Sequence, residues 1–445
     1  THTDSSAASD VYKRQELESL IENGRVTMEQ IDDAVRRILT VKYELGLFDD
    51  PFRYCDTIRE QKLTGASDIR AGALDMAKKS IVLLKNDEAV LPLKKQGQTI
   101  ALIGPLAADK NSPLGNWRIA GENNSAVSVL EGMLKYGGNT IIHEQGVKLV
   151  NEIPAFHKEV DINFSDKSGF KEAKRAAKNA DVVVMVLGEY GFQSGEGRSR
   201  SKLDLPGFQQ ELLEEVYAVN KNIILVLMNG RPLVLNWADE NLPAIVEAWH
   251  LGTESGNAIA EVLYGDYNPS GKLPMSFPRS VGQMPLYYNH KNTGRPGVKG
   301  ADVGSVFWSH YGDQKNAPLY PFGFGLSFTE FEYSKITLNK ASLTNNAKIE
   351  ASVTLTNTGK VKGKEVVQMY IRDHYASVTR PVRELKDFEL VELEHGESKQ
   401  IRFEITPETL QFYSAKKKWE SEPGAFTLFI GTNSATTRSI DFKLE

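Results

Sequence analysis

The sequence predicts an α/β fold, with a mostly parallel sheet sandwiched by helices, followed by an all-β sandwich. In residues 64–281, short continuous apolar runs alternate with amphipathic helical stretches, as in parallel sheets that are buried on both faces. In residues 331–445, short strands of alternating polarity are separated by turn residues. The 445 residues are 40% hydrophobic and 25% charged, a composition typical of a globular protein with two or three domains.

The first domain is expected to contain six strands and five helices. Because crossovers between parallel strands are right-handed, the loops that follow the strands should lie at one edge of the sheet. The expected strands are residues 81–84, 99–103, 140–143, 182–187, 223–228 and 244–249. The expected helices are residues 71–79, 128–136, 170–179, 208–217 and 255–263.

A long connection, residues 282–330, leads to the second domain. It is rich in Tyr, Asn, Gly and Pro, and irregular stretches of this length are often functional or run across an interface. The strands expected after it are residues 349–356, 365–371, 388–393, 400–405 and 426–431.

Residues 1–63 do not form a domain by themselves. After a short helix expected at residues 16–23, Thr27 and Gln30 form a capping box for a second helix, in which Ile31, Val35 and Ile38 share one face. A lone helix cannot bury that apolar face, so a domain that would cover it is expected to be missing from the sequence. Residues 10–15, DVYKRQ, also back-translate to the end of a sequencing adapter. We therefore expect an artefactual start, a terminal helix and a linker here.

Charge and composition exclude several classes of function. The net charge is −5 and no basic run stands out, so nucleic acid is not expected as a partner. The eight histidines show no metal-ligand spacing, and the single Cys55 cannot form an internal disulfide. No run approaches the about 18–20 apolar residues of a membrane span, and the polar residues 1–9 are not a signal peptide. We expect no metal, cofactor or membrane partner.

The loop in residues 187–209 carries the candidate chemistry. Glu196 lies between Gly195 and Gly197 after an apolar strand, with Arg198 and Arg200 close by. One interpretation is a surface Glu–Arg pair, which contributes little to stability. A phosphate cradle is a second, but no Lys-Ser or Lys-Thr pair closes a P-loop and an acidic residue opposes an anion. The third is a catalytic carboxylic acid on a mobile loop.

The loop resembles the acid/base loop of glycoside hydrolase family 3, the β-glucosidase family, in which a motif like SGEGRSR precedes a Leu-Pro pair and a Gln-containing helix. The resemblance runs from about Gln15 to the end of the chain. It includes the Gly-any-Trp loop, MNGRPL, the end of the α/β sandwich domain at residues 249–278, and a fibronectin type III-like domain at residues 331–445. Residues 26–52 resemble the last helix of the family's amino-terminal (β/α)₈ barrel and the linker after it.

The resemblance implies that Glu196 is the general acid/base of a retaining glycosidase, with Glu189 a weaker candidate. Trp117 would stack on the sugar, although a Trp packed under its own loop is an equal alternative, and Arg200 would bind substrate. The family's nucleophile is an Asp in a motif like Ser-Asp-Trp on a barrel strand, and this motif does not occur in the sequence.

The chain is thus expected to be a catalytically silent fragment of an exo-acting β-glycosidase. β-Glucosidase, which removes terminal β-D-glucosyl residues, is the first expectation and β-xylosidase the second. A non-catalytic carbohydrate-binding or scaffold protein stays open. A nucleotide-binding protein is disfavoured, because no GxGxxG or GxxxxGK[ST] occurs. The family resemblance favours a periplasmic or extracellular address and leaves a homodimer open.

Overall fold

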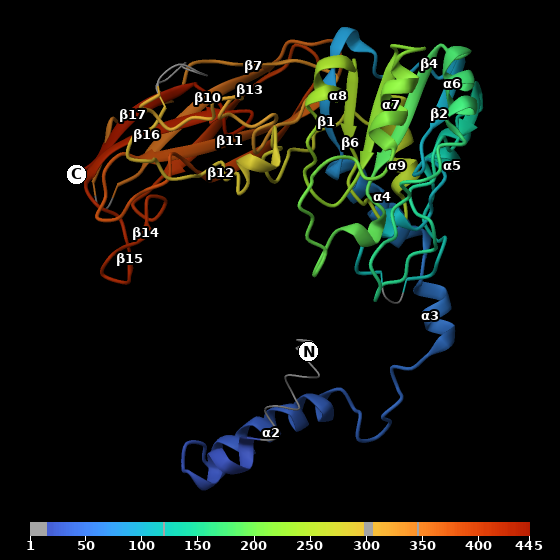
Figure 1. Cartoon of the computed structure of the whole chain (residues 1–445). Coiled ribbons are helices and arrows are strands. Elements are labelled where there is room, and N and C mark those ends of the chain that lie inside the picture. Colours follow the sequence, from blue (N-terminus) through green and yellow to red (C-terminus); the bar gives the residue numbers. More distant parts are fainter. Residues whose placement is uncertain (1–15, 119–120, 298–305, 345–346) are drawn as a thin grey trace. The chain divides into compact units, whose positions relative to one another are not determined.

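The computed structural model describes residues 16–118, 121–297, 306–344 and 347–445. The chain divides into two compact units, residues 1–69 and 70–445, and each is described by itself (Figure 1). The expected artefactual start, residues 1–15, lies outside the described residues. Since residues 70–445 form a single unit, the domain boundaries expected at residues 281 and 330 stay predictions.

The first unit consists of helices joined by turns where it is described. Residues 16–22 are helical, and α2 (Met28–Glu44) begins at the predicted capping box, in which Thr27 and Gln30 exchange side-chain-to-backbone hydrogen bonds. None of the residues of α2 is buried, so its apolar face lies exposed. The helix α3 (Thr57–Leu63) was not expected; Asp56 caps it by accepting hydrogen bonds from the amides of Ile58 and Arg59.

A six-stranded sheet forms the α/β part of the second unit. Its strand order is β1-β6-β5-β4-β2-β3, and every neighbouring pair is parallel except β1 with β6, so the prediction of a mostly parallel sheet is confirmed (Figure 1). The strands are β1 (Val82–Asn86), β2 (Gln96–Ile103), β3 (Gly138–Glu144), β4 (Val182–Gly188), β5 (Ile223–Met228) and β6 (Ala244–Glu247).

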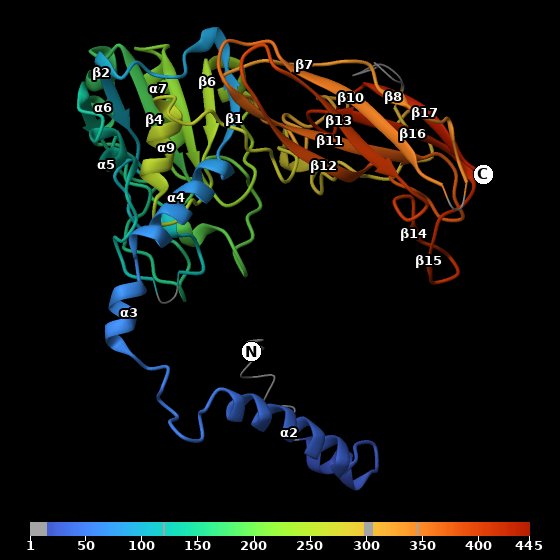
Figure 2. The same ribbon diagram turned by 180° about the vertical axis from the view of Figure 1, so that it is seen from behind.

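Helices cover both faces of this sheet. On one face, α4, α5 and α9 pack on side chains such as Val184 and Val226, and on the other α6, α7 and α8 pack on Met185 and Leu225 (Figures 1 and 2). The short helix α8 was not expected. The helices are α4 (Ser67–Ser80), α5 (Val129–Leu134), α6 (Phe170–Lys178), α7 (Gln209–Tyr217), α8 (Asn236–Asn241) and α9 (Ser255–Leu263).

The central strands are apolar because both of their faces are covered. Every residue of β4 and β5 is buried, which agrees with their unbroken runs of Val, Ile, Leu and Met. Each fully buried side chain of this kind contributes roughly 1.5–3 kcal/mol of transfer free energy. The sheet is thus a rigid support for the loops that leave its strands.

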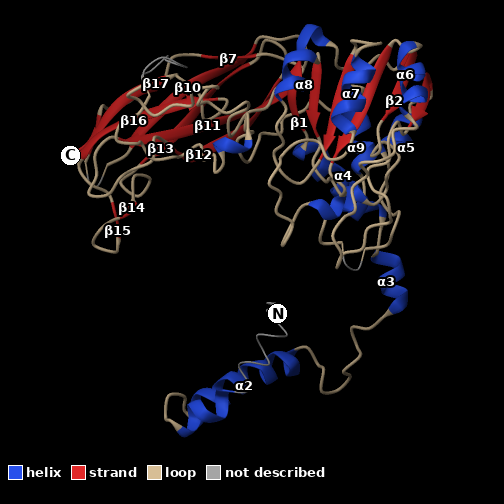
Figure 3. Ribbon diagram, viewed as in Figure 1, coloured by secondary structure: helices blue, strands red, loops and turns tan. Residues whose placement is uncertain are grey.

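The carboxyl-terminal part is a β sandwich, as predicted (Figure 3). Its sheets have the orders β13-β10-β7, with β8 also paired to β10, and β12-β11-β16-β17-β9, and their inner faces share one apolar core. The strands β7, β8, β9, β14, β15 and β17 are too short or too polar to have been expected. The strands are β7 (Phe331–Tyr333), β8 (Thr337–Leu338), β9 (Ser342–Leu343), β10 (Ile349–Asn357), β11 (Gly363–Asp373), β12 (Glu384–Leu393), β13 (Ser398–Ile405), β14 (Phe412–Tyr413), β15 (Trp419–Glu420), β16 (Gly424–Gly431) and β17 (Ser439–Leu444).

The end of the long connection packs back on the α/β part. The amide of Leu326 donates to the carbonyl of Leu83 on β1, at 2.8 Å. A buried ion pair then joins the two parts of the unit: Lys272 Nζ lies 3.0 Å from Glu365 Oε2 on β11. The sandwich is therefore tied to the sheet by polar contacts as well as by the chain.

Candidate active site

The candidate site lies where the strand order reverses. The chain places β3 on one side of β2 and β4 on the other, so the loops after β2 and β4 diverge at the carboxyl edge of the sheet. In open α/β sheets, ligands bind in the crevice at such a switch point. Glu189 and Glu196 both lie in the connection that follows β4.

Two glycines allow β2, β4 and β5 to lie side by side at their carboxyl ends. Gly188 has a φ of +144°, and a Cβ built on it would lie 2.0 Å from the carbonyl oxygen of Met228 on β5. Gly104, directly after β2, has a φ of +130°, and its Cβ would lie 2.2 Å from the carbonyl oxygen of Val186. No other residue fits either position without moving a neighbouring strand.

Glu189 is fully buried and pairs with two arginines. Its Oε1 lies 2.7 Å from Arg200 Nη1 and 3.0 Å from Arg231 Nε. The amide of Gly230 donates to Oε2 at 3.3 Å. A carboxylate so enclosed cannot reach a ligand, so the structure gives no support to Glu189 as a second proton donor.

Glu196 is exposed, by contrast, on a bend that two glycines shape. Gly195 has a φ of +112° and Gly197 a φ of +70°, conformations that side chains other than glycine rarely adopt. No described residue forms an ion pair or side-chain hydrogen bond with the Glu196 carboxylate. The simple surface Glu–Arg pair that was one interpretation of this loop is therefore not seen.

The two arginines of the loop, Arg198 and Arg200, donate hydrogen bonds to other groups of the protein. Arg200 donates to Glu189 and, through Nη2, to the carbonyl of Asp204 at 2.9 Å. Arg198 donates to the carbonyl of Lys158 at 3.1 Å and to that of Phe156. That Arg200 binds substrate stays a prediction. In the structure, its contacts with Glu189 and Asp204 connect two parts of the loop.

Trp117 lies near the loop that carries Glu196, at the edge of an aromatic cluster. Its ring is 5.8 Å from that of Phe156, which is 5.9 Å from Phe192, the residue four positions before Glu196. Trp117 is 61% exposed. A ring exposed to this extent is not packed beneath its own loop. Stacking on a sugar stays a prediction.

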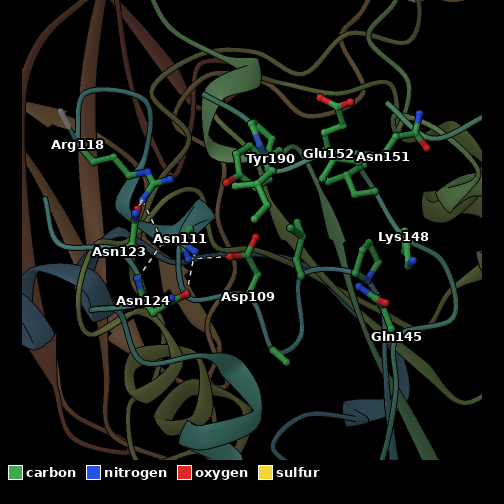
Figure 4. A pocket seen from close by; sticks show the side chains of 18 of the residues that line it. Asp109, Asn111, Arg118, Asn123, Asn124, Gln145, Lys148, Asn151, Glu152 and Tyr190 are labelled. Atoms are coloured by element: carbon green, nitrogen blue, oxygen red, sulfur yellow. Dashed lines mark hydrogen bonds between the residues drawn. The ribbon is translucent and has the colours of Figure 1, made fainter. Parts of the chain in front are cut away.

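A pocket of about 750 Å³ opens at the same switch point (Figure 4). Asp109, on the loop after β2, accepts a hydrogen bond from the amide of Asn111, and Asn111 is bonded to Arg118 and Asn124. The pocket therefore presents both hydrogen-bond donors and acceptors. The other polar side chains that line it are Asn123, His143, Gln145, Lys148, Asn151, Glu152 and Tyr190.

This pocket could not be predicted from the sequence, because its residues come from three separate loops. The turn after β5, which carries the MNGRPL segment, also takes part in the site through Arg231. Within the described part of the chain, no group of three or more His, Cys, Asp or Glu side chains could hold a metal ion. Of the described helices, none combines the length and apolar character needed to cross a membrane.

Glu247, at the end of β6, is fully buried, and no cationic side chain among the described residues pairs with it. It accepts hydrogen bonds from the amide of Trp249 at 3.0 Å and from Asn229 Nδ2 at 3.1 Å. Burial raises the pKa of Glu247 well above its ordinary value of 4.5. The folded protein therefore keeps a proton here that the unfolded chain loses.

Glu247→Gln should remove a pH dependence of stability. In the wild type, as pH rises above about 4.5, the unfolded state ionises first, so stability falls until the pH passes the folded-state pKa. Gln cannot ionise, so urea unfolding at pH 5.0 and 7.5 should show the variant gaining roughly 1–3 kcal/mol relative to wild type at the higher pH. Glu211→Gln, at an exposed ion pair, serves as the control. Parallel pH profiles for wild type and Glu247→Gln would contradict a protonated Glu247.

Comparison with known proteins decides the family. The model of the Glycosyl hydrolase family 3 C-terminal domain matches residues 81–328, more than half of the chain. The chain belongs to glycoside hydrolase family 3. The model of the Fibronectin type III-like domain matches residues 365–434, within the sandwich. The resemblance noted in the loop of residues 187–209, in the Gly-any-Trp loop and in residues 249–278 is thereby confirmed at the level of the family.

Two relatives and one solved structure are named as β-glucosidases or as a β-xylosidase. The chain is 44% identical to the periplasmic β-glucosidase of Salmonella typhimurium over 98% of its own length and 42% identical to a β-xylosidase of Formosa agariphila over 95%. A β-glucosidase from Listeria innocua, solved in complex with glucose, superposes with a TM-score of 0.85 at 37% identity, covering 97% of the chain. The chain spans 58%, 56% and 56% of these three proteins, respectively.

Proposed function

We propose that this chain supplies the proton-donating half of a retaining exo-β-glycosidase active site, with Glu196 as general acid/base. The observation that carries the proposal is an exposed, unpaired carboxylate on a glycine bend at the switch point of a family 3 α/β domain. The first-choice substrate is a terminal β-D-glucosyl residue, because the relative with 44% identity and the Listeria structure are named β-glucosidases. The relative with 42% identity makes β-xylosidase the second candidate.

The chemistry needs two carboxyl groups about 5–5.5 Å apart on either side of the scissile bond. In the proposed mechanism, Glu196 protonates the leaving oxygen while the facing carboxylate attacks the anomeric carbon. Glu196 then takes a proton from the water that hydrolyses the glycosyl-enzyme. A glycine bend lets the carboxylate approach the sugar and withdraw as product leaves. Trp117 would offer a face to the leaving group.

The facing carboxylate is proposed to come from a (β/α)₈ barrel, as the family resemblance implies. The Ser-Asp-Trp-like motif that would carry it does not occur in the sequence. The 445 residues would therefore bind part of the substrate without turning it over. A periplasmic address, drawn from the name of the Salmonella relative, belongs to the same proposal.

The proposal is tested by restoring the missing half. In a hybrid, the chain replaces the segment that it matches in the Salmonella enzyme, which is 44% identical. We expect the hybrid to hydrolyse an aryl β-glucoside, faster than the aryl β-xyloside, and the chain alone to show no turnover. A folded hybrid without glycosidase activity would refute the proposal. Turnover by the chain alone that is lost in Glu196→Gln would refute the need for a second half.

A further inference from the structure

We infer that Glu189 is a positioning residue for Glu196: its buried carboxylate holds two arginines, and these fix both sides of the bend that carries Glu196. The inference rests on the proposed function, because positioning matters to the reaction only if Glu196 is the acid/base. The arrangement of the bend itself can be tested without any activity.

First, several hydrogen-bond donors converge on the Glu189 carboxylate. Glu189 has an exposed side-chain fraction of 0%, and its two partners, Arg200 and Arg231, have 19% and 18%. Both guanidinium groups contact Oε1, and Oε2 accepts hydrogen bonds from Arg231 Nε and from the amide of Gly230, each at 3.3 Å. Hydrogen bonds between charged partners are about twice as strong as neutral ones, and a planar guanidinium has a fixed set of donor directions. Glu189 therefore fixes where the remaining donors of each arginine point.

The second step is what those remaining donors hold. Arg231 Nη2 donates to the carbonyl of Arg198 at 2.8 Å and also to that of Gln193. One nitrogen thus connects the residues on either side of the segment 194–197. On the far side, Arg200 Nη2 holds the carbonyl of Asp204. The carboxylate of Glu189 acts on Glu196 only through these bonds.

The third step is that the base of the loop is closed independently. The side-chain amide of Gln209 accepts from the amide of Gly188 at 2.9 Å and donates to its carbonyl at 2.8 Å. The side chain of Gln193 accepts from the amide of Tyr190 at 2.8 Å. With both ends of the loop held, the conformational freedom that remains lies in residues 194–197, where the two positive-φ glycines flank Glu196.

Charge explains why the carboxylate is required. Without it, two guanidinium groups would lie next to each other, mostly shielded from water and with no anion between them. Removing one partner of a buried ion group is strongly unfavourable, so at least one arginine should turn toward solvent. The arginine that leaves takes its bonds to the loop with it, and the segment around Glu196 loses its frame.

The test begins with the chain as it exists, by amide hydrogen exchange. In Glu189→Gln, peptides that cover residues 190–205 should exchange about tenfold faster than in wild type, while those of β4 and β5 keep their protection. Arg231→Lys keeps the ion pair with Glu189 but loses the planar guanidinium that reaches two carbonyls, so it should loosen the same peptides. If Glu189→Gln does not fold, Arg231→Lys alone still tests whether the arginines hold the bend. Glu211→Gln, at the exposed pair with Lys167, is the matched control and should change nothing.

The kinetic part uses the hybrid enzyme and separates positioning from a general loss of stability. Glu189→Gln should lower kcat by about tenfold to a hundredfold with little change in KM, the size expected for a misplaced catalytic group. In a Glu196→Gln background it should have no further effect, because there is no longer a proton donor to position.

Four outcomes would overturn the inference. Unchanged exchange of residues 190–205 in both Glu189→Gln and Arg231→Lys would show that the two arginines do not hold the bend. Equal losses of kcat with and without the Glu196 carboxyl group would show that Glu189 acts by stability alone. Full activity in Glu189→Gln, with activity lost in Glu196→Gln, would remove the inference and leave the proposed function standing. If Glu196→Gln itself keeps full activity, the proposed function fails, and the positioning role fails with it.

Discussion

Replacing Glu196 with Gln in the hybrid enzyme should lower kcat for an alkyl β-glucoside by about 10²–10⁴-fold, the usual contribution of a positioned general acid. Gln keeps the size and hydrogen-bonding reach of the side chain but has no proton to give to the leaving oxygen. The loss in kcat/KM, which reports formation of the glycosyl-enzyme, should be large for the alkyl β-glucoside and much smaller for dinitrophenyl β-glucoside, because that leaving group departs without protonation. Steady-state kinetics on the two substrates measures this difference directly.

Glu214→Gln, on the exposed side of α7, is a suitable control for a single carboxyl-to-amide change in the same region. It should leave kcat and KM for both substrates within about twofold of wild type, as expected for a surface change. Equal losses of kcat/KM on the two substrates in Glu196→Gln would mean that the residue does not protonate the leaving group. An unchanged kcat on both would assign the acid role elsewhere.

Replacing Gly188 with Ala should destabilise the α/β part by about 3–5 kcal/mol, among the largest effects of a single substitution. The added methyl group would lie 2.0 Å from the carbonyl oxygen of Met228, and the φ of +144° is one that an L-residue rarely adopts. Either β4 or β5 must move, and both are fully buried. Urea unfolding followed by fluorescence and circular dichroism measures the loss.

Gly197→Ala separates the steric effect from the strain of a positive φ. Gly197 has a φ of +70°, and a Cβ built on it meets nothing within 4 Å. Its replacement should cost only about 1 kcal/mol, the strain of a left-handed non-glycine residue. If Gly188→Ala were as mild as Gly197→Ala, the close approach between β4 and β5 at Gly188 would not be as tight as the structure has it.

Much of the fold could be predicted because burial leaves a simple pattern. Strands β4 and β5 are covered on both faces and appear in the sequence as unbroken apolar runs, while β10 is half buried and alternates. Short elements are a different matter. The six residues of α8 and the two of β8 give too few turns or alternations to detect, and tertiary contacts decide their conformation.

The exposed part of the site was predictable and its support was not. Glu196 between two glycines is a local feature with a family resemblance around it. The support of the loop is non-local: Arg231 lies 42 positions from Glu189 along the chain and meets it only because β4 and β5 are neighbours in the sheet. Arg200, interpreted as a substrate ligand from its place in the motif, is bonded to Glu189 within the same loop.

The most direct test of the central claim is azide rescue of Glu196→Ala in the hybrid enzyme. With dinitrophenyl β-glucoside, the leaving group departs without an acid and the glycosyl-enzyme accumulates, since no base activates water. Azide is a small nucleophile that needs no base, so adding it should restore turnover and release β-glucosyl azide, the product of net retention. Recovery of α-glucosyl azide, or no acceleration by azide in a folded variant of low activity, would contradict Glu196 as the acid/base of a retaining glycosidase.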